Sequence, residues 1–278
     1  MSQDQTTRGY DEDGYAFPLD AVDQGEAAEL RDDLESAERE LADDPEKLAL
    51  LRTYPDRLLP SFDALIRNER LVAAAASVLG PELIVWSSAL FTKEANSPKV
   101  VSWHQDLTYW GLDDVKETTC WVALTSSTER SGAVKFVAGS HKHKAVPHVD
   151  TWAKDNLLSR GQEVAVDVDE SDAVIVELNP GQFSMHHGHM FHSSGPNTTD
   201  DRRIGAAIRY MAASMKQRDG YKPLVAQVAG KGQWDHLRIA SSPRGRLQES
   251  DFERCRQDAN AKRRIFYEGT EQADDPQD

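Results

Sequence analysis

The sequence is poor in cysteine and has no long apolar run. Among its 278 residues only Cys120 and Cys255 are cysteines, and neither stands in a metal-binding spacing. Two isolated cysteines exclude a disulfide framework and are typical of a reducing compartment, so we expect a cytoplasmic protein. No segment approaches the roughly 20 consecutive apolar residues of a membrane helix. The polar stretch 1–13 lacks an apolar core, so no signal peptide is expected.

Positive charge is scarce relative to negative charge. The chain has 47 Asp and Glu residues against 32 Lys and Arg residues, a formal net charge of −15. This excess opposes bulk attraction to nucleic acid or to an anionic membrane, and we expect neither as a partner. The simplest interpretation is a solvated acidic surface. With 39% hydrophobic residues, a chain of this length can bury one sizeable core.

Helical patterns come first along the chain, and strand patterns follow. Apolar residues recur every three or four positions over 24–42, and further helices are predicted over 60–69, 71–79 and 249–267. Residues 14–19 are predicted to form a short strand or an extended entry segment. Further strands are predicted over 83–92, 100–106, 119–125, 132–137, 173–178, 181–187 and 203–211. The pattern favours an α+β, mainly β fold, in which helices flank a β-sandwich or barrel.

The chain is predicted to form a single domain over 1–278. It contains no internal repeat and no stretch with the composition of a linker. The polar stretches 1–8 and 269–278 have the composition of flexible ends. No pattern in the sequence specifies an oligomeric state.

A short motif in the strand-rich part carries two metal-binding side chains. His104 and Asp106 flank Gln105 in a predicted strand, so alternation points both toward the same side. Two imidazoles and one carboxylate hold a ferrous ion on one face and leave three coordination positions open. The third ligand of such a site must come from a distant strand.

A histidine-rich stretch offers candidates for that third ligand. It contains His186, His187, His189 and His192. Not all of these can face one ion, and the first three also suit ordinary hydrogen-bonded histidines. His192 is favoured because Ser194 and Arg203 follow it.

The strand after this stretch places two arginines on one face. Alternation groups the following side chains together: Arg203, Gly205, Ala207 and Arg209. The small residues predict room for a ligand between the two guanidiniums. Arg203 can hold the far end of a dicarboxylate through two parallel hydrogen bonds while a keto-acid end chelates iron. The alternative is a surface ion pair of Arg203 with Asp200 or Asp201.

Together these motifs resemble the phytanoyl-CoA dioxygenase family of iron(II)- and 2-oxoglutarate-dependent oxygenases. The matching segments are Trp103–Asp106, Trp121–Leu124, Val137–His141 and His192–Asn197, followed by Arg203. The resemblance spans about residues 80–212. It implies a double-stranded β-helix (jelly roll) with the iron inside one end. It also places His141 in a turn, as a structural residue.

The resemblance implies a role for each site residue. The iron(II) ligands would be His104, Asp106 and His192. The residues that bind 2-oxoglutarate would be Arg203, Ser194 and Trp121, with the first two on the distal carboxylate. Lys93 stands where the family commonly has Lys-Pro-Pro, but Glu94 and Ala95 follow it here, and its role stays open.

We therefore predict a dioxygenase that uses molecular oxygen to hydroxylate an unactivated C–H bond of a small-molecule substrate. Asp106 favours hydroxylation, because related halogenases carry a small residue in its place. The substrate would be a small polar metabolite, such as an aminoalkylphosphonate or a similar zwitterion. A binding protein of the cupin type, with a metal but no catalysis, is the alternative. A zinc hydrolase that uses the histidine-rich stretch is disfavoured, since no suitable base accompanies the ligands.

Four residues near the metal strand are candidates for substrate contact: Gln105, Tyr109, Trp110 and Arg209. Aromatic faces can surround a cation while arginine holds an anion. Tyr109 and Trp110 equally suit core aromatics. Six residues of strand span roughly 20 Å, so Arg203 and Arg209 cannot hold the same small dicarboxylate. Arg209 would bind another anionic group or pair with an acidic residue.

Overall fold

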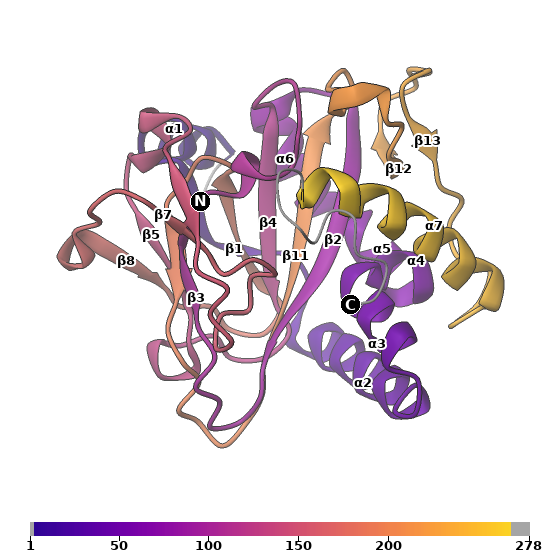
Figure 1. Ribbon diagram of the computed structural model, residues 1–278, viewed down its shortest axis with the longest axis horizontal. Coiled ribbons are helices and arrows are strands. Elements are labelled where there is room, and N and C mark those ends of the chain that lie inside the picture. Colours follow the sequence, from indigo (N-terminus) through magenta and orange to yellow (C-terminus); the bar gives the residue numbers. More distant parts are fainter. Residues whose placement is uncertain (1–2, 268–278) are drawn as a thin grey trace.

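Two facing sheets form the body of the molecule in this computed structural model, which describes residues 3–267 (Figure 1). The larger sheet contains, in spatial order, β1 (Tyr15–Asp20), β9 (Gln182–His187), β4 (Glu117–Ala123), β11 (Arg203–Ala212), β2 (Leu83–Lys93), β12 (Leu224–Ala229) and β13 (Arg238–Ile239). The smaller sheet contains β3 (Val101–His104), β10 (His192–Ser194), β5 (Val134–Val137) and β8 (Ala173–Val176). A separate hairpin joins β6 (His148–Asp150) to β7 (Gln162–Val164). Neighbouring strands are antiparallel apart from the pair β12–β13.

Helices cover the outer face of the larger sheet. They are α1 (Gln3–Asp13), α2 (Gln24–Glu40), α3 (Pro45–Thr53), α4 (Pro55–Leu58), α5 (Pro60–Ile66), α6 (Glu69–Leu79) and α7 (Glu249–Phe266). In Figure 1, α2 to α5 and α7 gather on the side of the larger sheet that faces away from β3, β5 and β8. The result is the predicted jelly roll with flanking helices.

Helix α2 shows how the local sequence builds this layer. Asp23 and Glu26 form a reciprocal capping box at its N-terminus, which satisfies backbone N–H groups that have no partner inside the helix. The predicted apolar stripe is buried, from Ala27 and Leu30 to Ala37. Burial of this stripe anchors the helix in the main hydrophobic core.

Strand β11 gives one face to the helices and the other to the interior between the sheets. Ile204, Ile208 and Tyr210 belong to the core shared with the helices. Arg203 and Arg209, on the alternate positions, line a pocket between the two sheets. The period of two along a strand thus separates the structural core from the candidate site.

Several elements differ from those predicted. Asp106 is not on a strand, because β3 ends at His104 and a 3-10 turn (Asp106–Thr108) begins at Asp106. Residues 3–8 of the polar stretch that was predicted to be flexible belong to helix α1, and residues 1–2 lie outside the described residues. Helices α3 and α4 and strands β6, β7, β10, β12 and β13 were not predicted. The stretch 269–278, predicted to be flexible, lies outside the described residues, and the single-domain assignment stays a prediction.

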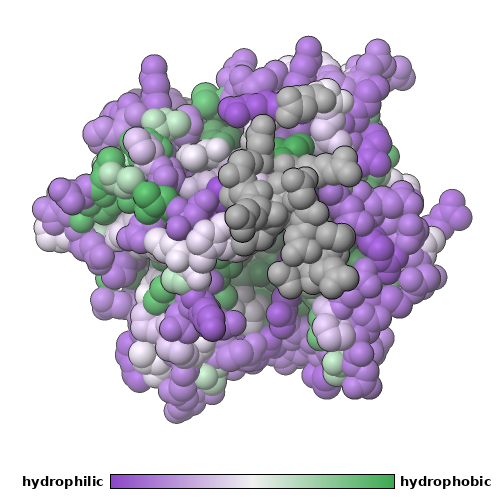
Figure 2. All heavy atoms as spheres, in the orientation of Figure 1, coloured by the Kyte–Doolittle hydropathy of each residue, from purple (hydrophilic) through white to green (hydrophobic). Residues whose placement is uncertain are grey.

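The surface is polar, and both cysteines are inside. Figure 2 shows a face made mainly of hydrophilic residues, with smaller groups of hydrophobic ones. Cys120 and Cys255 are buried and unpaired, as expected. Over residues 3–267, no helix has both the length and the apolar character needed to cross a membrane.

Candidate metal and cofactor site

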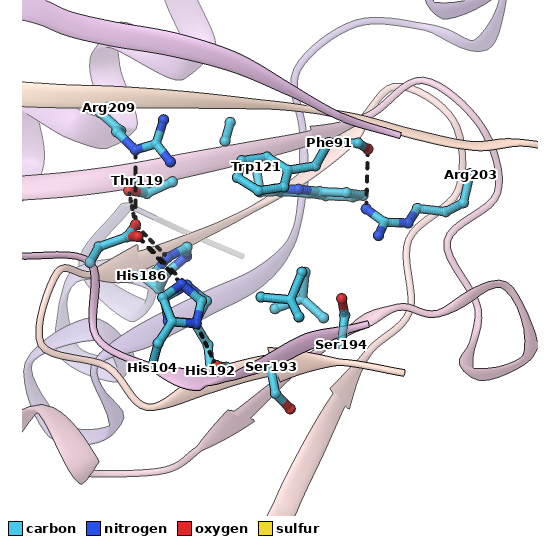
Figure 3. Close-up of a pocket in the computed structure, with 14 residues that line it drawn as sticks. Phe91, His104, Thr119, Trp121, His186, His192, Ser193, Ser194, Arg203 and Arg209 are labelled. Carbon is cyan, nitrogen blue, oxygen red and sulfur yellow. Dashed lines mark hydrogen bonds and ion pairs between the residues drawn. The ribbon is translucent and has the colours of Figure 1, made fainter. Parts of the chain in front are cut away.

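His104, Asp106 and His192 meet at one end of the pocket (Figure 3). His104 ends β3 and pairs in register with His192, which opens β10. His104 Nε2 lies 3.5 Å from Asp106 Oδ1, and His192 Nε2 lies 4.0 Å from the same oxygen. One donor atom from each residue fits within 4.8 Å of the other two. The three residues can therefore share one ion, although the turn at Asp106 replaces the strand that was predicted.

Backbone carbonyls orient both imidazoles. His104 Nδ1 lies 2.9 Å from the carbonyl of Ser102, and His192 Nδ1 lies 2.9 Å from that of Met190. A carbonyl only accepts, so each Nδ1 carries the hydrogen and each Nε2 presents a lone pair. Burial lowers the pKa of His192 well below its usual value, which keeps the ring neutral. Neutral imidazole is the form that binds metal.

Asp106 is held in its charged form. Burial alone would raise its pKa, but the imidazoles of His104 and His186 and the guanidinium of Arg209 together hold the pKa well below its usual range. Oδ1 faces His104 and His192, the two candidate ligands, while Oδ2 accepts a hydrogen bond of 3.3 Å from Thr119 Oγ1. Behind Thr119 lies Glu117, whose pKa burial raises well above its usual value. Sequence reasoning missed this carboxyl.

A row of polar side chains crosses the larger sheet beneath Asp106. His186, Thr119, Arg209 and Ser87 occupy paired positions on β9, β4, β11 and β2. His186 Nε2 and Arg209 Nε each lie 3.9 Å from Asp106 Oδ2. Neither nitrogen of His186 has a hydrogen-bond partner among the described residues. His186 lines the pocket beside the three candidate ligands, whereas His187 and His189 do not line it.

Arg203 is buried at the opposite end of the pocket. Its side chain is 1% exposed, and no described carboxylate forms an ion pair with it. The surface-ion-pair alternative is wrong, since Asp201 pairs with Arg31 and Asp200 accepts from Asn96. Burial lowers the pKa of Arg203 to about 10, a value at which it is still charged at neutral pH. A buried guanidinium without a counter-ion is costly and suits an anionic ligand.

Trp121 fills the space that the sequence left open above Gly205. The guanidinium of Arg203 lies 5.2 Å from the centre of the Trp121 ring. A Cβ atom on Gly205 would come within 1.8 Å of Trp121 Cζ2. Gly205 and Ala207 were expected to leave room for a ligand. That expectation is wrong at Gly205, because the Trp121 ring occupies the space. In Figure 3 Trp121 lies between Arg203 and the histidines.

Lys93 was left without a role, and the structure places it beside Ser194. It is fully buried, and its Nζ donates to Ser194 Oγ at 2.7 Å, to the Ser194 carbonyl at 3.2 Å and to the Gly195 carbonyl. It pairs in register with Arg203. Burial and the charge of Arg203 lower the pKa of Lys93 to about 6. The signal in the sequence was a lysine at the end of an apolar strand.

Of the four candidates for substrate contact, only Arg209 lines the pocket. Gln105 is fully buried, and its amide bonds the backbone of Lys144, Val146 and His189, so it holds a loop in place instead.

The two aromatic candidates lie behind the pocket. Trp110 packs on Trp86 at 5.0 Å and beneath the guanidinium of Arg209 at 4.9 Å. Tyr109 contacts His148 and Arg160.

The residues present fit both a metal ion and an acidic ligand. The donor set of two histidines and one aspartate is typical of iron(II) oxygenases that keep open coordination positions. Arg203 and Lys93 are both buried, and no carboxylate in the described part of the chain pairs with either, so both fit a bound carboxylate. The fold and the site are thus of the kind expected for a non-haem iron oxygenase.

Comparison with known proteins places the chain within one family. The family model for phytanoyl-CoA dioxygenase (PhyH) matches residues 10–205, and the chain belongs to this family. The solved apo structure of the non-heme monooxygenase ThoJ is 31% identical, with a TM-score of 0.82 over 92% of this chain and 96% of that chain. The residues matched by the family model, 10–205, contain His104, Asp106 and His192.

Two curated relatives carry dioxygenase names. A probable alpha-ketoglutarate-dependent hypophosphite dioxygenase of Stutzerimonas stutzeri is 29% identical over 57% of this chain and 56% of its own length. An ectoine dioxygenase of Bordetella parapertussis is 28% identical over 51% of this chain and 50% of its own length. The matched region thus spans about half the length of these relatives. The predictions of family and of fold class are confirmed, and that of a 2-oxoglutarate-dependent dioxygenase is confirmed at the level of the family.

Proposed function

We propose that this protein is an iron(II)- and 2-oxoglutarate-dependent dioxygenase that hydroxylates a C–H bond of a small polar metabolite. The observation that carries the proposal is one pocket with two ends. His104, Asp106 and His192 lie at one end. The guanidinium of Arg203, which pairs with no described carboxylate, lies at the other. An oxo-dicarboxylic acid matches this arrangement, because its keto-acid end chelates iron while its distal carboxylate needs a cation.

Six residues of the pocket would have a part in this reaction. His104, Asp106 and His192 would hold the ion, and the carbonyls behind the two histidines fix which imidazole nitrogen would face it. Arg203 and Ser194 would hold the distal carboxylate, and Trp121, beside the guanidinium of Arg203, would form a flat wall next to it. Iron with 2-oxoglutarate and oxygen supplies the oxidising chemistry. The protein itself would bind and orient the cofactors and shield them from water. The burial of all these residues favours that role.

Arg209 supports an anionic or zwitterionic substrate. Its ring neighbours are Trp110 at 4.9 Å and Phe91 at 5.9 Å, which hold the guanidinium in place. Among the described residues its Nε has no hydrogen-bond partner, and its Nη1 donates to Ser87 Oγ at 3.4 Å. Donors are therefore left for a ligand. Hypophosphite, named for one relative, is a small oxyanion, and an aminoalkylphosphonate carries a comparable group.

The proposal is tested by incubating the protein in air with iron(II), 2-oxoglutarate and a panel of small polar metabolites, anions and zwitterions included. We expect succinate to form, and one metabolite to gain the mass of one oxygen atom. The Asp106→Ala variant is the matched control and should form no succinate. Binding of metal and 2-oxoglutarate without succinate would favour the non-catalytic alternative.

A prediction follows for Arg209. Replacing it by methionine, which keeps the length but removes the charge, should abolish hydroxylation of the substrate while succinate continues to form at saturating 2-oxoglutarate. The measurement is the ratio of hydroxylated product to succinate. An unchanged ratio in a folded variant would show that Arg209 serves only as the charge partner of Asp106.

A further inference from the structure

Lys93 and Arg203 are a pair of buried basic side chains. Arg203 lines the end of the pocket farthest from the candidate metal ligands, and Lys93 contacts Ser194, which lines the pocket as well. Lys93 and Arg203 face each other in register on β2 and β11, are 0% and 1% exposed, and no described carboxylate pairs with either. Two like charges side by side in a dry site repel each other and lose hydration. We propose that Lys93 is a positioning residue for the distal carboxylate of 2-oxoglutarate and acts through the hydroxyl of Ser194. This inference rests on the proposed use of 2-oxoglutarate.

The contacts of Lys93 explain how it acts. Its Nζ has three acceptors: the carbonyls of Ser194 and Gly195, and Ser194 Oγ at 2.7 Å. A charged ammonium has three N–H donors, one for each acceptor. Ser194 Oγ then accepts from Lys93, so its own hydrogen is free to point into the pocket. A carboxylate there would receive that hydrogen bond in addition to those of Arg203.

The turn that Lys93 holds is tightly packed. Gly132 lies against it, and a Cβ atom there would come within 2.5 Å of the Gly195 carbonyl and 3.1 Å of Lys93 Nζ. Asn197 ties the same turn to β2 by donating to the backbone carbonyl of Lys93 at 3.2 Å. Ser194 therefore has little freedom to move, and its hydroxyl direction depends on the amine.

Another buried lysine shows what a structural role looks like in this protein. Lys262 on α7 is 5% exposed, but its Nζ pairs with Asp258 Oδ2 at 3.0 Å. Its charge is thus balanced within the fold, whereas that of Lys93 is not. The absence of a described counter-ion distinguishes Lys93 as a residue whose charge is completed by a ligand.

The test compares 2-oxoglutarate binding to the wild-type protein, Lys93→Met and the matched control Lys262→Met, each loaded with manganese(II), by calorimetry. We expect Lys93→Met to bind about 10- to 100-fold more weakly. Lys262→Met should keep the wild-type affinity even if it melts at a lower temperature. As a second probe, 2-oxopentanoate has the same chain length but no distal carboxylate. It should bind the wild-type protein and Lys93→Met equally.

A double-mutant cycle tests whether Lys93 acts on 2-oxoglutarate through the Ser194 hydroxyl or independently of it. If Lys93 acts through the hydroxyl, adding Lys93→Met to Ser194→Ala should weaken binding much less than it does in the wild-type background. Fully additive losses, or a Lys93→Met variant that binds 2-oxoglutarate within twofold of wild type, would overturn the inference. A wild-type protein that does not bind 2-oxoglutarate at all would instead refute the proposed function. Equal weakening of 2-oxopentanoate binding would also overturn the inference, since it would indicate general damage.

Discussion

Three basic side chains lie in or beside one pocket, whereas Asp106 is the only carboxylate among the described residues that lines it. Lys93, Arg203 and Arg209 are 0%, 1% and 9% exposed. Residues of this kind are rarely buried without partners. A ferrous ion and 2-oxoglutarate carry equal and opposite charges. When both bind, the basic side chains of the pocket still outnumber Asp106, and a net positive charge remains. That excess favours an anionic group on the substrate.

Arg203 is the residue whose loss should separate cofactor binding from metal binding. Arg203→Met removes a charge-assisted contact in a buried site, a loss of about 2–5 kcal/mol. We expect the concentration of 2-oxoglutarate needed for half-maximal succinate formation to rise roughly 30-fold or more, while the iron content stays at the wild-type level. An unchanged requirement for 2-oxoglutarate would contradict the assignment of Arg203.

The lowered pKa of Lys93 predicts a pH dependence of 2-oxoglutarate binding. In the free protein burial and Arg203 lower this pKa to about 6, so the amine is mostly neutral above that pH. A bound carboxylate raises the pKa again, and binding takes up a proton. Affinity should therefore be highest near about pH 6 and fall as the pH rises.

The groups around Lys93 define the control for this experiment. Arg203 on β11 is the charged group that faces it, β10 presents the Ser194 hydroxyl and backbone carbonyls, and the neighbouring Glu94 pairs with Arg202. Affinity is measured from about pH 6 to about pH 8.5 in the manganese(II)-loaded protein. Lys93→Met should lack the slope. The same slope in both proteins would assign the proton to another group.

At the scale of elements, the register of the larger sheet assembles the pocket. On β11, Arg209 pairs with Thr119 of β4 and Ser87 of β2, whereas Arg203 at the other end pairs with Lys93. Alternation along β11 was predicted from the sequence, and its pocket face is confirmed. The neighbours of each residue were not predicted, because register depends on pairing between segments that are distant in the chain.

Gly205 shows how closely β4 and β11 fit together. Gly205→Ala would place its Cβ 1.8 Å from Trp121 Cζ2, so the indole must shift from its place beside Arg203. Overpacking of this kind costs about 1–3 kcal/mol. We expect a lower melting temperature and weaker 2-oxoglutarate binding.

The control for this variant is Gly9→Ala in α1, where the nearest atom to the new Cβ is 4.0 Å away. Calorimetry and thermal unfolding check both variants. A Gly205→Ala variant with wild-type stability and affinity would contradict the packing described here.

The elements that sequence reasoning missed were short or lacked an apolar pattern. Strand β10 has three residues, His192–Ser194, too few for alternation to be visible. Helices α3 and α4 begin with Pro45 and Pro55, a start signal that the sequence did contain. Asp106 was placed on a strand because the spacing His-x-Asp fits one, yet a turn brings the two side chains together equally well.

At the scale of the whole molecule, the jelly roll brings together segments that are far apart in the chain. His104, His192 and Arg203 meet around one pocket because β3, β10 and β11 belong to two facing sheets. The motifs alone indicated this set, since they occur together in the order found in one family. Gln105, Tyr109 and Trp110 were assigned to the substrate by closeness in sequence, which does not reveal the direction of a side chain. A cytoplasmic location stays a prediction.

The central claim is that His104, Asp106 and His192 together hold the iron that this protein uses with 2-oxoglutarate. The most direct measurement is iron content and succinate formation in air for the wild-type protein and for the alanine variant of each residue, with His141→Ala as the control outside the pocket. The account predicts one iron per chain and 2-oxoglutarate-dependent succinate for the wild type and the control, and neither for the three variants, all of which should fold. Wild-type succinate formation in any of the three variants would contradict it.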